Sequence, residues 1–98
     1  MKLKKLRAKS AFDLAKLLGL SPADGLEIKI RSDLNDKIIN VVKQKSLTHA
    51  QVAKLAGTSR TRITALLNRN THDISTDLML RIIASLGIKA RIQFKAAA

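Results

Sequence analysis

Apolar residues recur every three or four positions over most of the chain, and this spacing is typical of helices that bury one face. The pattern predicts a short first helix over residues 10–18, with Gly19 as its stop signal. Ser21 followed by Pro22 is typical of a helix N-terminus and opens a longer helix over about residues 23–45. The apolar positions of this second helix recur every four residues, at Leu26, Ile30, Leu34, Ile38 and Val42.

One part of the second helix has a competing pattern. Residues 26–31 alternate between apolar and polar side chains, as a strand with one buried face would. The four-residue repeat extends much further along the chain, and it favours a helix. An interruption near Gly25 or Ser32 is an alternative, and the sequence leaves helix or strand open over residues 24–33.

Two short helices follow, and both have clear end signals. Thr48 lies three residues before Gln51, which is the spacing of a capping box, so a helix is predicted to begin there. Gly57 ends this helix because glycine readily takes the left-handed conformation after a helix end. Ser59 then supplies the next N-cap, and a further helix is predicted over about residues 60–68.

The remaining residues predict one more helix and a strand. The helix begins at the Ser75 cap, ends at Gly87 and carries an apolar side made of Leu78, Met79, Ile82, Ile83 and Leu86. Residues Ile88–Lys95 then alternate between apolar and polar, which is the pattern of a half-buried strand. The predicted fold class is therefore all-α, a bundle of about five helices with a short C-terminal β-strand.

The same pattern divides the chain into three parts. Residues 1–9 form a basic N-terminal arm with few apolar positions, and residues 10–87 form the helical domain. Residues 88–98 form a C-terminal strand and tail.

The charge of the chain indicates what kind of partner this domain binds. The chain has 98 residues with 19 Lys+Arg against 7 Asp+Glu, for a net charge of +12. Self-repulsion of this size opposes compaction, and it favours a polyanionic partner. Between Lys37 and His72 there are seven basic residues and no acidic one, and residues 1–9 hold five more basic residues. We therefore expect a polyanion-facing surface in the middle of the domain.

Composition excludes several other classes. The chain has no Cys, which excludes disulfide scaffolds, thiolate zinc sites and Cys nucleophiles. Its only aromatic residues are Phe12 and Phe94, too few for the stacking platforms that bind single-stranded nucleic acid. His49 and His72 are far apart and lack a carboxylate at ligand spacing, so we expect no metal, no cofactor and no enzymatic activity. Without a long apolar run or a secretory signal, the expected location is cytoplasmic and nucleoid-associated, with no membrane partner.

Residues 48–68 have the features of a helix-turn-helix, in which two short helices cross closely after a sharp turn. Ala53 is small where the two helices approach each other, and Gly57 supplies the turn. The predicted core of this motif consists of Val52, Ala53, Gly57, Ile63 and Leu66. The joint spacing of these residues in a strongly basic chain predicts DNA binding.

The stretch Leu47–Arg60 (LTHAQVAKLAGTSR) resembles the "L-[ST]-Q-x-x-[LV]-A-x-x-x-G-[VT]-S-x" core of Xre-type, lambda-repressor-like regulators. Residues 61–68 resemble the recognition helix of that family, and the resemblance extends over about Leu34–Leu86. Residues 75–94 are similar to the HigA-like antitoxin branch and to phage-derived regulators. The resemblance implies a lambda-repressor-like helix-turn-helix bundle. It also implies an alternative role as an antitoxin that neutralises a small RNase-type toxin.

The sequence departs from the family pattern at one position. His49 stands where family members usually have Gln, whose hydrogen bond braces the recognition helix. A His there can still donate a hydrogen bond to a phosphate. The bracing contact itself is not predicted by this sequence.

Helical geometry assigns the candidate contacts with DNA. Arg60 lies at the N-terminus of the predicted recognition helix, the end that enters the major groove in this motif. The predicted base-reading residues are Arg60, Thr61, Thr64 and Ala65. The predicted contacts with the DNA backbone come from Lys43, Lys45, Thr48, His49, Lys54, Arg62, Asn68 and Arg69.

These observations predict a sequence-specific DNA-binding transcriptional regulator that binds double-stranded DNA and autoregulates its own operon. We expect a homodimer because one such helix reads only a few base pairs. Its interface is predicted to use the strand Ile88–Lys95 and the apolar flank of Leu78–Leu86. The competing hypotheses are the antitoxin role, which is compatible with DNA binding, and a nonspecific adaptor for RNA or an anionic membrane surface.

Overall fold

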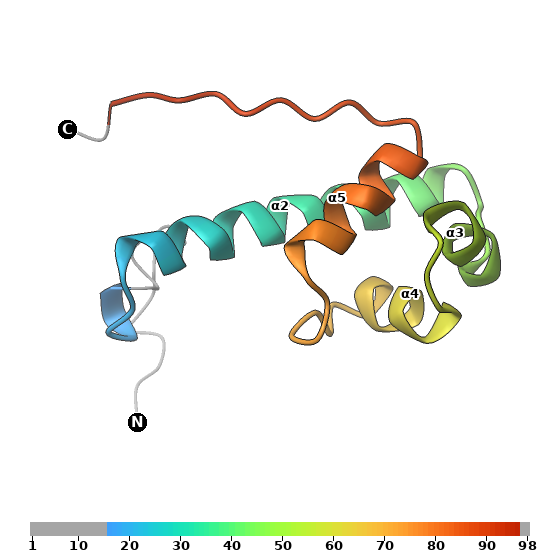
Figure 1. The fold of residues 1–98 in the computed structure, drawn as a ribbon, viewed down its shortest axis with the longest axis horizontal. Helices are drawn as coiled ribbons and strands as arrows, with labels where there is room; N and C mark the ends of the chain where they lie inside the picture. Colours follow the sequence, from blue (N-terminus) through green and yellow to red (C-terminus); the bar gives the residue numbers. More distant parts are fainter. Residues whose placement is uncertain (1–15, 97–98) are drawn as a thin grey trace.

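The structure is a computed structural model that describes residues 16–96 and contains four helices, with no strand in that range. The helices are α2 (Pro22–Gln44), α3 (His49–Ala56), α4 (Arg60–Leu67) and α5 (Thr76–Ser85). Figure 1 shows α3, α4 and α5 gathered around the C-terminal half of α2, whose N-terminal half projects away from them. The all-α prediction is confirmed, but the described residues contain four helices where the sequence predicted about five.

The predicted first helix, residues 10–18, lies mostly outside the described residues. Residues 16 and 17 are helical, and the chain then leaves the helical conformation. Gly19 follows with a φ of 73° and donates its backbone N–H to Lys16 O at 3.1 Å. Gly19 is therefore a stop signal, as predicted, because few residues other than glycine take this conformation readily.

The long helix α2 is continuous over 23 residues, so the strand alternative over residues 24–33 and the interruption near Gly25 or Ser32 are wrong. Its N-terminus is fixed locally: Asp24 N donates to Ser21 Oγ at 3.1 Å, and Ser21 N donates to Asp24 Oδ2 at 3.1 Å. This reciprocal capping, with Pro22 in the first turn, favours a helix where the period-two pattern favoured a strand. No helix in the described part of the chain is long and apolar enough to cross a membrane.

The core lies where α3, α4 and α5 meet the C-terminal half of α2. Its buried apolar side chains are Leu34, Ile38, Val41, Val42, Val52, Ala53, Ala56, Ile63, Leu66, Ile74, Leu78, Met79, Ile82, Ile83 and Leu86. Burying one large aliphatic side chain stabilises a fold by roughly 1.5–3 kcal/mol, so burial of this cluster is the main contribution to the stability of the fold. Leu26 belongs to the same four-residue repeat but is 49% exposed, because it lies on the projecting half of α2.

Three helix C-termini are closed by a side chain from a distant part of the sequence. Asn35 Nδ2 donates to Leu66 O at 2.9 Å, Arg81 Nε to Ala56 O at 3.0 Å and Lys45 Nζ to Leu86 O at 3.1 Å. The last carbonyls of a helix have no partner within it and carry partial negative charge. These donors therefore fix where α4, α3 and α5 end relative to the other elements.

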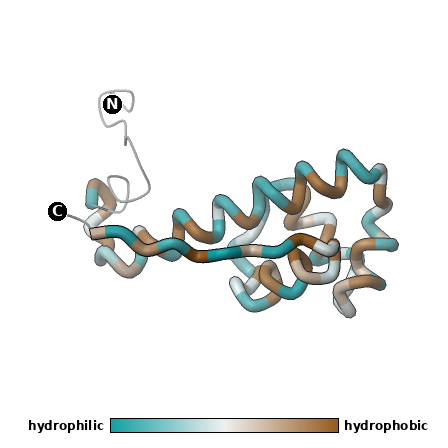
Figure 2. The backbone as a smooth tube through the Cα atoms, turned by 90° about the horizontal axis from the view of Figure 1, so that it is seen from above, coloured by the Kyte–Doolittle hydropathy of each residue, from teal (hydrophilic) through white to brown (hydrophobic). Residues whose placement is uncertain are grey.

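The predicted C-terminal strand is absent from the described residues. Residues 88–96 follow α5 as a single extended segment that runs back toward the N-terminal end of α2 (Figure 1). Hydrophilic and hydrophobic residues alternate along it, as Figure 2 shows, but no second extended segment pairs with its backbone in the described chain. Alternation alone does not make a strand, because a strand needs a neighbour for its N–H and C=O groups. Ile88 packs against the core, whereas Ile92 is 70% and Phe94 91% exposed.

Candidate nucleic-acid interface

The turn between α3 and α4 is built from local signals. Thr48 and Gln51 form the predicted capping box: Gln51 N donates to Thr48 Oγ1 at 3.1 Å, and Thr48 N donates to Gln51 Oε1 at 2.8 Å. Gly57 closes α3 with a φ of 67°, in the left-handed region. Ser59 caps α4 by accepting a hydrogen bond from Arg62 N at 3.2 Å. The chain therefore turns from one capped helix into the next within three residues.

The two helices cross on small and branched side chains. Ala53 is 6% exposed, and Val52, Ile63 and Leu66 are fully buried. Because Ala53 carries only a methyl group, α3 and α4 can lie close together, and the position of α4 is fixed by a packed contact. This arrangement holds one face of α4 against the core and leaves its opposite face open.

The open face begins at the N-terminus of α4. Arg60, Thr61 and Arg62 are all exposed there, whereas Thr64 and Ala65 are half-buried further along the helix. An arginine at this end of a recognition helix can donate two hydrogen bonds to guanine O6 and N7. Of the predicted base-reading residues, Arg60 and Thr61 are therefore the most accessible.

His49 joins the two helices of the motif. It is the first residue of α3, and its Nδ1 lies 2.7 Å from Thr64 Oγ1 on α4, a hydrogen-bond distance. The bracing contact with α4, which the sequence left open, is thus made here by an imidazole. This contact engages the hydroxyl of Thr64, which was predicted to hydrogen-bond base edges or phosphate.

The remaining predicted backbone contacts differ in how much of each side chain is available. Lys43, in the last turn of α2, and Lys54, in α3, are exposed. Lys45 Nζ is bound to Leu86 O, and the hydroxyl of Thr48 is used as a cap. Thr48 therefore has the capping role predicted for it, and Lys45 has a structural role that the sequence did not indicate.

Two predicted contact residues lie at the far end of α4. Asn68 is the C-cap of that helix, and Arg69 follows it with a φ of 61°, so Arg69 does not continue the helix face on which it was placed. Arg69 Nη1 lies 2.6 Å from Asp36 Oδ1 on α2 in an exposed ion pair. Both side chains are more than half exposed, and such pairs contribute little to stability.

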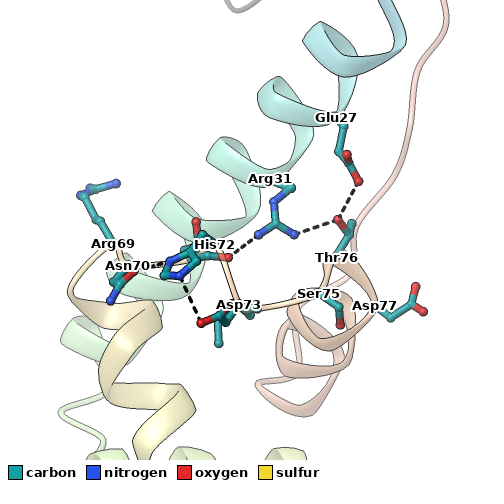
Figure 3. Close-up of a pocket in the computed structure, with 11 residues that line it drawn as sticks. Glu27, Arg31, Arg69, Asn70, His72, Asp73, Ser75, Thr76 and Asp77 are labelled. Carbon is teal, nitrogen blue, oxygen red and sulfur yellow. Dashed lines mark hydrogen bonds and ion pairs between the residues drawn. The ribbon is translucent and has the colours of Figure 1, made fainter. Parts of the chain in front are cut away.

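Sequence reasoning missed Arg31, which lines a polar depression shown in Figure 3. Arg31 Nη2 donates to Thr71 O at 2.6 Å and its Nη1 donates to Thr76 Oγ1 at 3.0 Å, so it ties α2 to the loop before α5. Glu27 and Asp73 lie in the same depression, which makes it unsuitable for a polyanion. Thr71 and Thr76 are at least forty residues from Arg31 in the sequence, so no local pattern could have indicated these two hydrogen bonds.

Comparison with known families gives one result. The sequence pattern of the family described as "Helix-turn-helix domain" matches residues 17–95 of this chain, which include α2–α5 and most of the extended C-terminal segment. No curated protein and no solved structure matches the chain.

Proposed function

The chain belongs to the helix-turn-helix domain family, and from this premise we propose that it is a sequence-specific transcriptional regulator acting on its own operon. The single observation that supports this most strongly is the exposed N-terminal turn of α4. It presents Arg60, Thr61 and Arg62 on a helix whose other face is packed into the core. We also propose that the chain belongs to the Xre-type regulators that its sequence resembles.

Charge supports the choice of a polyanion. No acidic residue lies between Lys37 and His72, so α3, α4 and their turn present only basic charges. Lysines and arginines that contact phosphates release condensed counterions, which makes DNA binding fall steeply with salt. The phosphate contacts would come from exposed side chains around α4, including Lys43, Lys54 and Arg62. They position the protein on the duplex, while Arg60 and Thr61 read bases.

A homodimer is part of the proposal. Two copies can read two half-sites one helical turn of DNA apart, which gives more sequence information than one α4 helix. The extended segment 88–96 has no backbone partner among the described residues and exposes Ile92 and Phe94. An extended segment with free N–H and C=O groups can pair with the same segment of a second copy.

An antitoxin role is a second candidate, favoured by exposed leucines away from α4. Leu17, Leu18, Leu20 and Leu26 are 40–63% exposed at the projecting end of α2 and just before it. Clustered exposed apolar side chains are typical of protein-protein contacts. Co-purification with the product of the neighbouring gene, and its loss in Leu18→Asp, would test this role.

The regulator proposal is tested by titrating the full-length protein against the duplex upstream of its own gene and against a competitor duplex of equal length. We expect the upstream duplex to bind at least a thousandfold tighter, as is typical of specific regulators. Both affinities should fall as salt rises. Equal affinity for the two duplexes would contradict sequence-specific regulation, and it would favour a nonspecific nucleic-acid adaptor.

A further inference from the structure

His49 is the one titratable side chain that bridges α3 and α4 in the described structure. Its Nδ1 is 2.7 Å from Thr64 Oγ1. Its Nε2 has no hydrogen-bond partner among the described residues and is not enclosed by them. Histidine is also the side chain that ordinarily changes charge between about pH 5 and 8. One imidazole nitrogen of this bridge is therefore open to a ligand.

The hydrogen bond between His49 and Thr64 can run in either direction with the same heavy-atom positions. When imidazole is neutral with its hydrogen on Nε2, Nδ1 accepts the hydroxyl hydrogen of Thr64. When imidazole is protonated, Nδ1–H donates to Thr64 Oγ1, and the hydroxyl hydrogen is free to point elsewhere. A neutral imidazole with its hydrogen on Nδ1 also donates to Thr64 Oγ1, but its Nε2 then has no hydrogen; only the imidazolium donates from both nitrogens at once.

Within residues 16–96, no acidic side chain pairs with His49. The charged side chains on α3 and on the helices packed against it are Lys54 on α3, Arg60 and Arg62 on α4, and Asp77 and Arg81 on α5. Asp77 is exposed in the first turn of α5, and Arg81 is bound to Ala56 O at the C-terminal end of α3, whereas His49 begins that helix. Lys43 and Lys45 at the end of α2 add only positive charge.

A DNA phosphate would supply the missing anion. In a helix-turn-helix the first helix of the motif crosses the DNA backbone while the second enters the major groove. His49 opens the first helix, α3, and its solvent-accessible Nε2 is the nitrogen that can face the backbone. A phosphate beside Nε2–H favours the imidazolium form, because an opposite charge stabilises the charged state.

We propose that His49 couples DNA binding to proton uptake: its imidazolium donates Nε2–H to a phosphate and Nδ1–H to Thr64, which frees the Thr64 hydroxyl to donate to a base. This inference rests on the proposed DNA-binding function and deepens it. Affinity then rises as pH falls, because binding takes up a proton. A donating hydroxyl selects the acceptors of the major groove, namely purine N7, guanine O6 and thymine O4.

The test uses the full-length protein and the duplex most enriched by selection from a randomised pool at neutral pH. Dissociation constants are measured at about pH 6 and pH 8 at fixed ionic strength, and proton uptake is measured calorimetrically in two buffers of different ionisation enthalpy. Wild type should bind about tenfold tighter at the lower pH, with uptake approaching one proton. His49→Gln retains an amide that can brace α4 but cannot titrate, so its affinity should not change with pH.

Two further variants separate the parts of the proposal. His72→Gln removes the other histidine, which lies in the loop before α5, and it should keep the wild-type pH dependence. Thr64→Val should keep the proton uptake but lose the preference for a base acceptor at one position of the selected duplex. Retention of the full pH dependence by His49→Gln, or a wild-type affinity that changes less than twofold, would overturn the proposal while leaving DNA binding intact. If the selection enriches no duplex at all, the proposed regulator function and the proposed role of His49 both fail.

Discussion

Asn35 is the one buried polar residue in the described core. Its amide donates to Leu66 O at the C-terminal end of α4, and Leu66 O also accepts Arg69 N. A buried polar group that is fully paired fixes one arrangement of the helices, because any shift leaves it without a partner. The single amide therefore sets where the recognition helix ends on α2.

Asn35→Ala should lower the free energy of unfolding by about 1–3 kcal/mol, because it removes the donor to Leu66 O and leaves space in the core. Asn40 is an exposed asparagine on the same helix, and Asn40→Ala should change stability by at most about 0.5 kcal/mol. Urea denaturation of both variants measures the difference. Equal stabilities would show that the Asn35 amide does not hold α4 in place.

At this scale the sequence predicts contacts only when both partners are close along the chain. The Thr48–Gln51 capping box spans three residues and was predicted from its spacing alone. The bond from Arg81 to Ala56 O spans 25 residues, and nothing in the local pattern distinguishes Arg81 from an arginine that is simply solvated. The His49–Thr64 bridge could not be predicted for a related reason, because the partner of His49 depends on how α3 and α4 cross.

At the scale of elements, the function depends on the crossing of α3 and α4. Ala53 is buried in α3 where the two helices pack, while the neighbouring Lys54 is exposed. The position and direction of Arg60 at the start of α4 depend on this contact. A change that separates the helices should therefore affect DNA binding before it unfolds the protein.

Ala53→Leu should lower stability by about 1–3 kcal/mol, because three additional carbons must enter a packed contact. It should also weaken DNA binding at temperatures where the variant is still folded, since α4 is displaced from the groove. Lys54→Leu adds an apolar side chain one residue away on the exposed side and should leave the fold intact. Thermal melts paired with DNA titrations decide the matter, and an Ala53→Leu protein that behaves like wild type in both would contradict this account of the motif.

The elements themselves were predictable wherever their end signals are local. The caps at Ser21, Thr48, Ser59 and Ser75 and the stop at Gly57 place the helices to within a residue or two. The segment Ile88–Lys95 shows the limit of pattern alone, because the alternation that predicts a strand is present in a segment that pairs with no other part of residues 16–96. A strand depends on a second piece of backbone, and a period-two pattern cannot say where that backbone comes from.

At the scale of the whole molecule, the helices of the motif lie away from the exposed apolar side chains at the projecting end of α2. The charged side chains of α3 and α4 themselves are all basic, while exposed apolar side chains lie on the projecting half of α2 and on the C-terminal segment. Figure 1 shows this segment running along the projecting half of α2, away from α4. Such a separation allows two copies to associate through one end and to contact DNA with the other.

The double substitution Ile92→Asp and Phe94→Asp should convert the proposed dimer to a monomer, because it places charges where apolar side chains would be buried between copies. Gln93 lies between them in the same extended segment but is already polar, so Gln93→Asp removes no apolar contact and should remain dimeric. Light scattering gives the mass of each protein. A wild-type monomer, both free and on DNA, would contradict the homodimer, and a dimeric double variant would place its interface elsewhere.

The most direct test of sequence-specific reading by α4 is the ratio of affinities for the upstream duplex and the competitor, measured for wild type, Arg60→Ala and Arg69→Ala. Arg60→Ala should reduce the difference in binding free energy between the two duplexes by about 1–3 kcal/mol. It should bind the upstream duplex more weakly and the competitor with little change. Arg69 lies beyond α4 and pairs with Asp36, so Arg69→Ala should leave the ratio unchanged while weakening both duplexes by the same small factor. An Arg60→Ala protein that loses equal affinity for both duplexes would contradict the placement of α4 in the major groove and the account built on it.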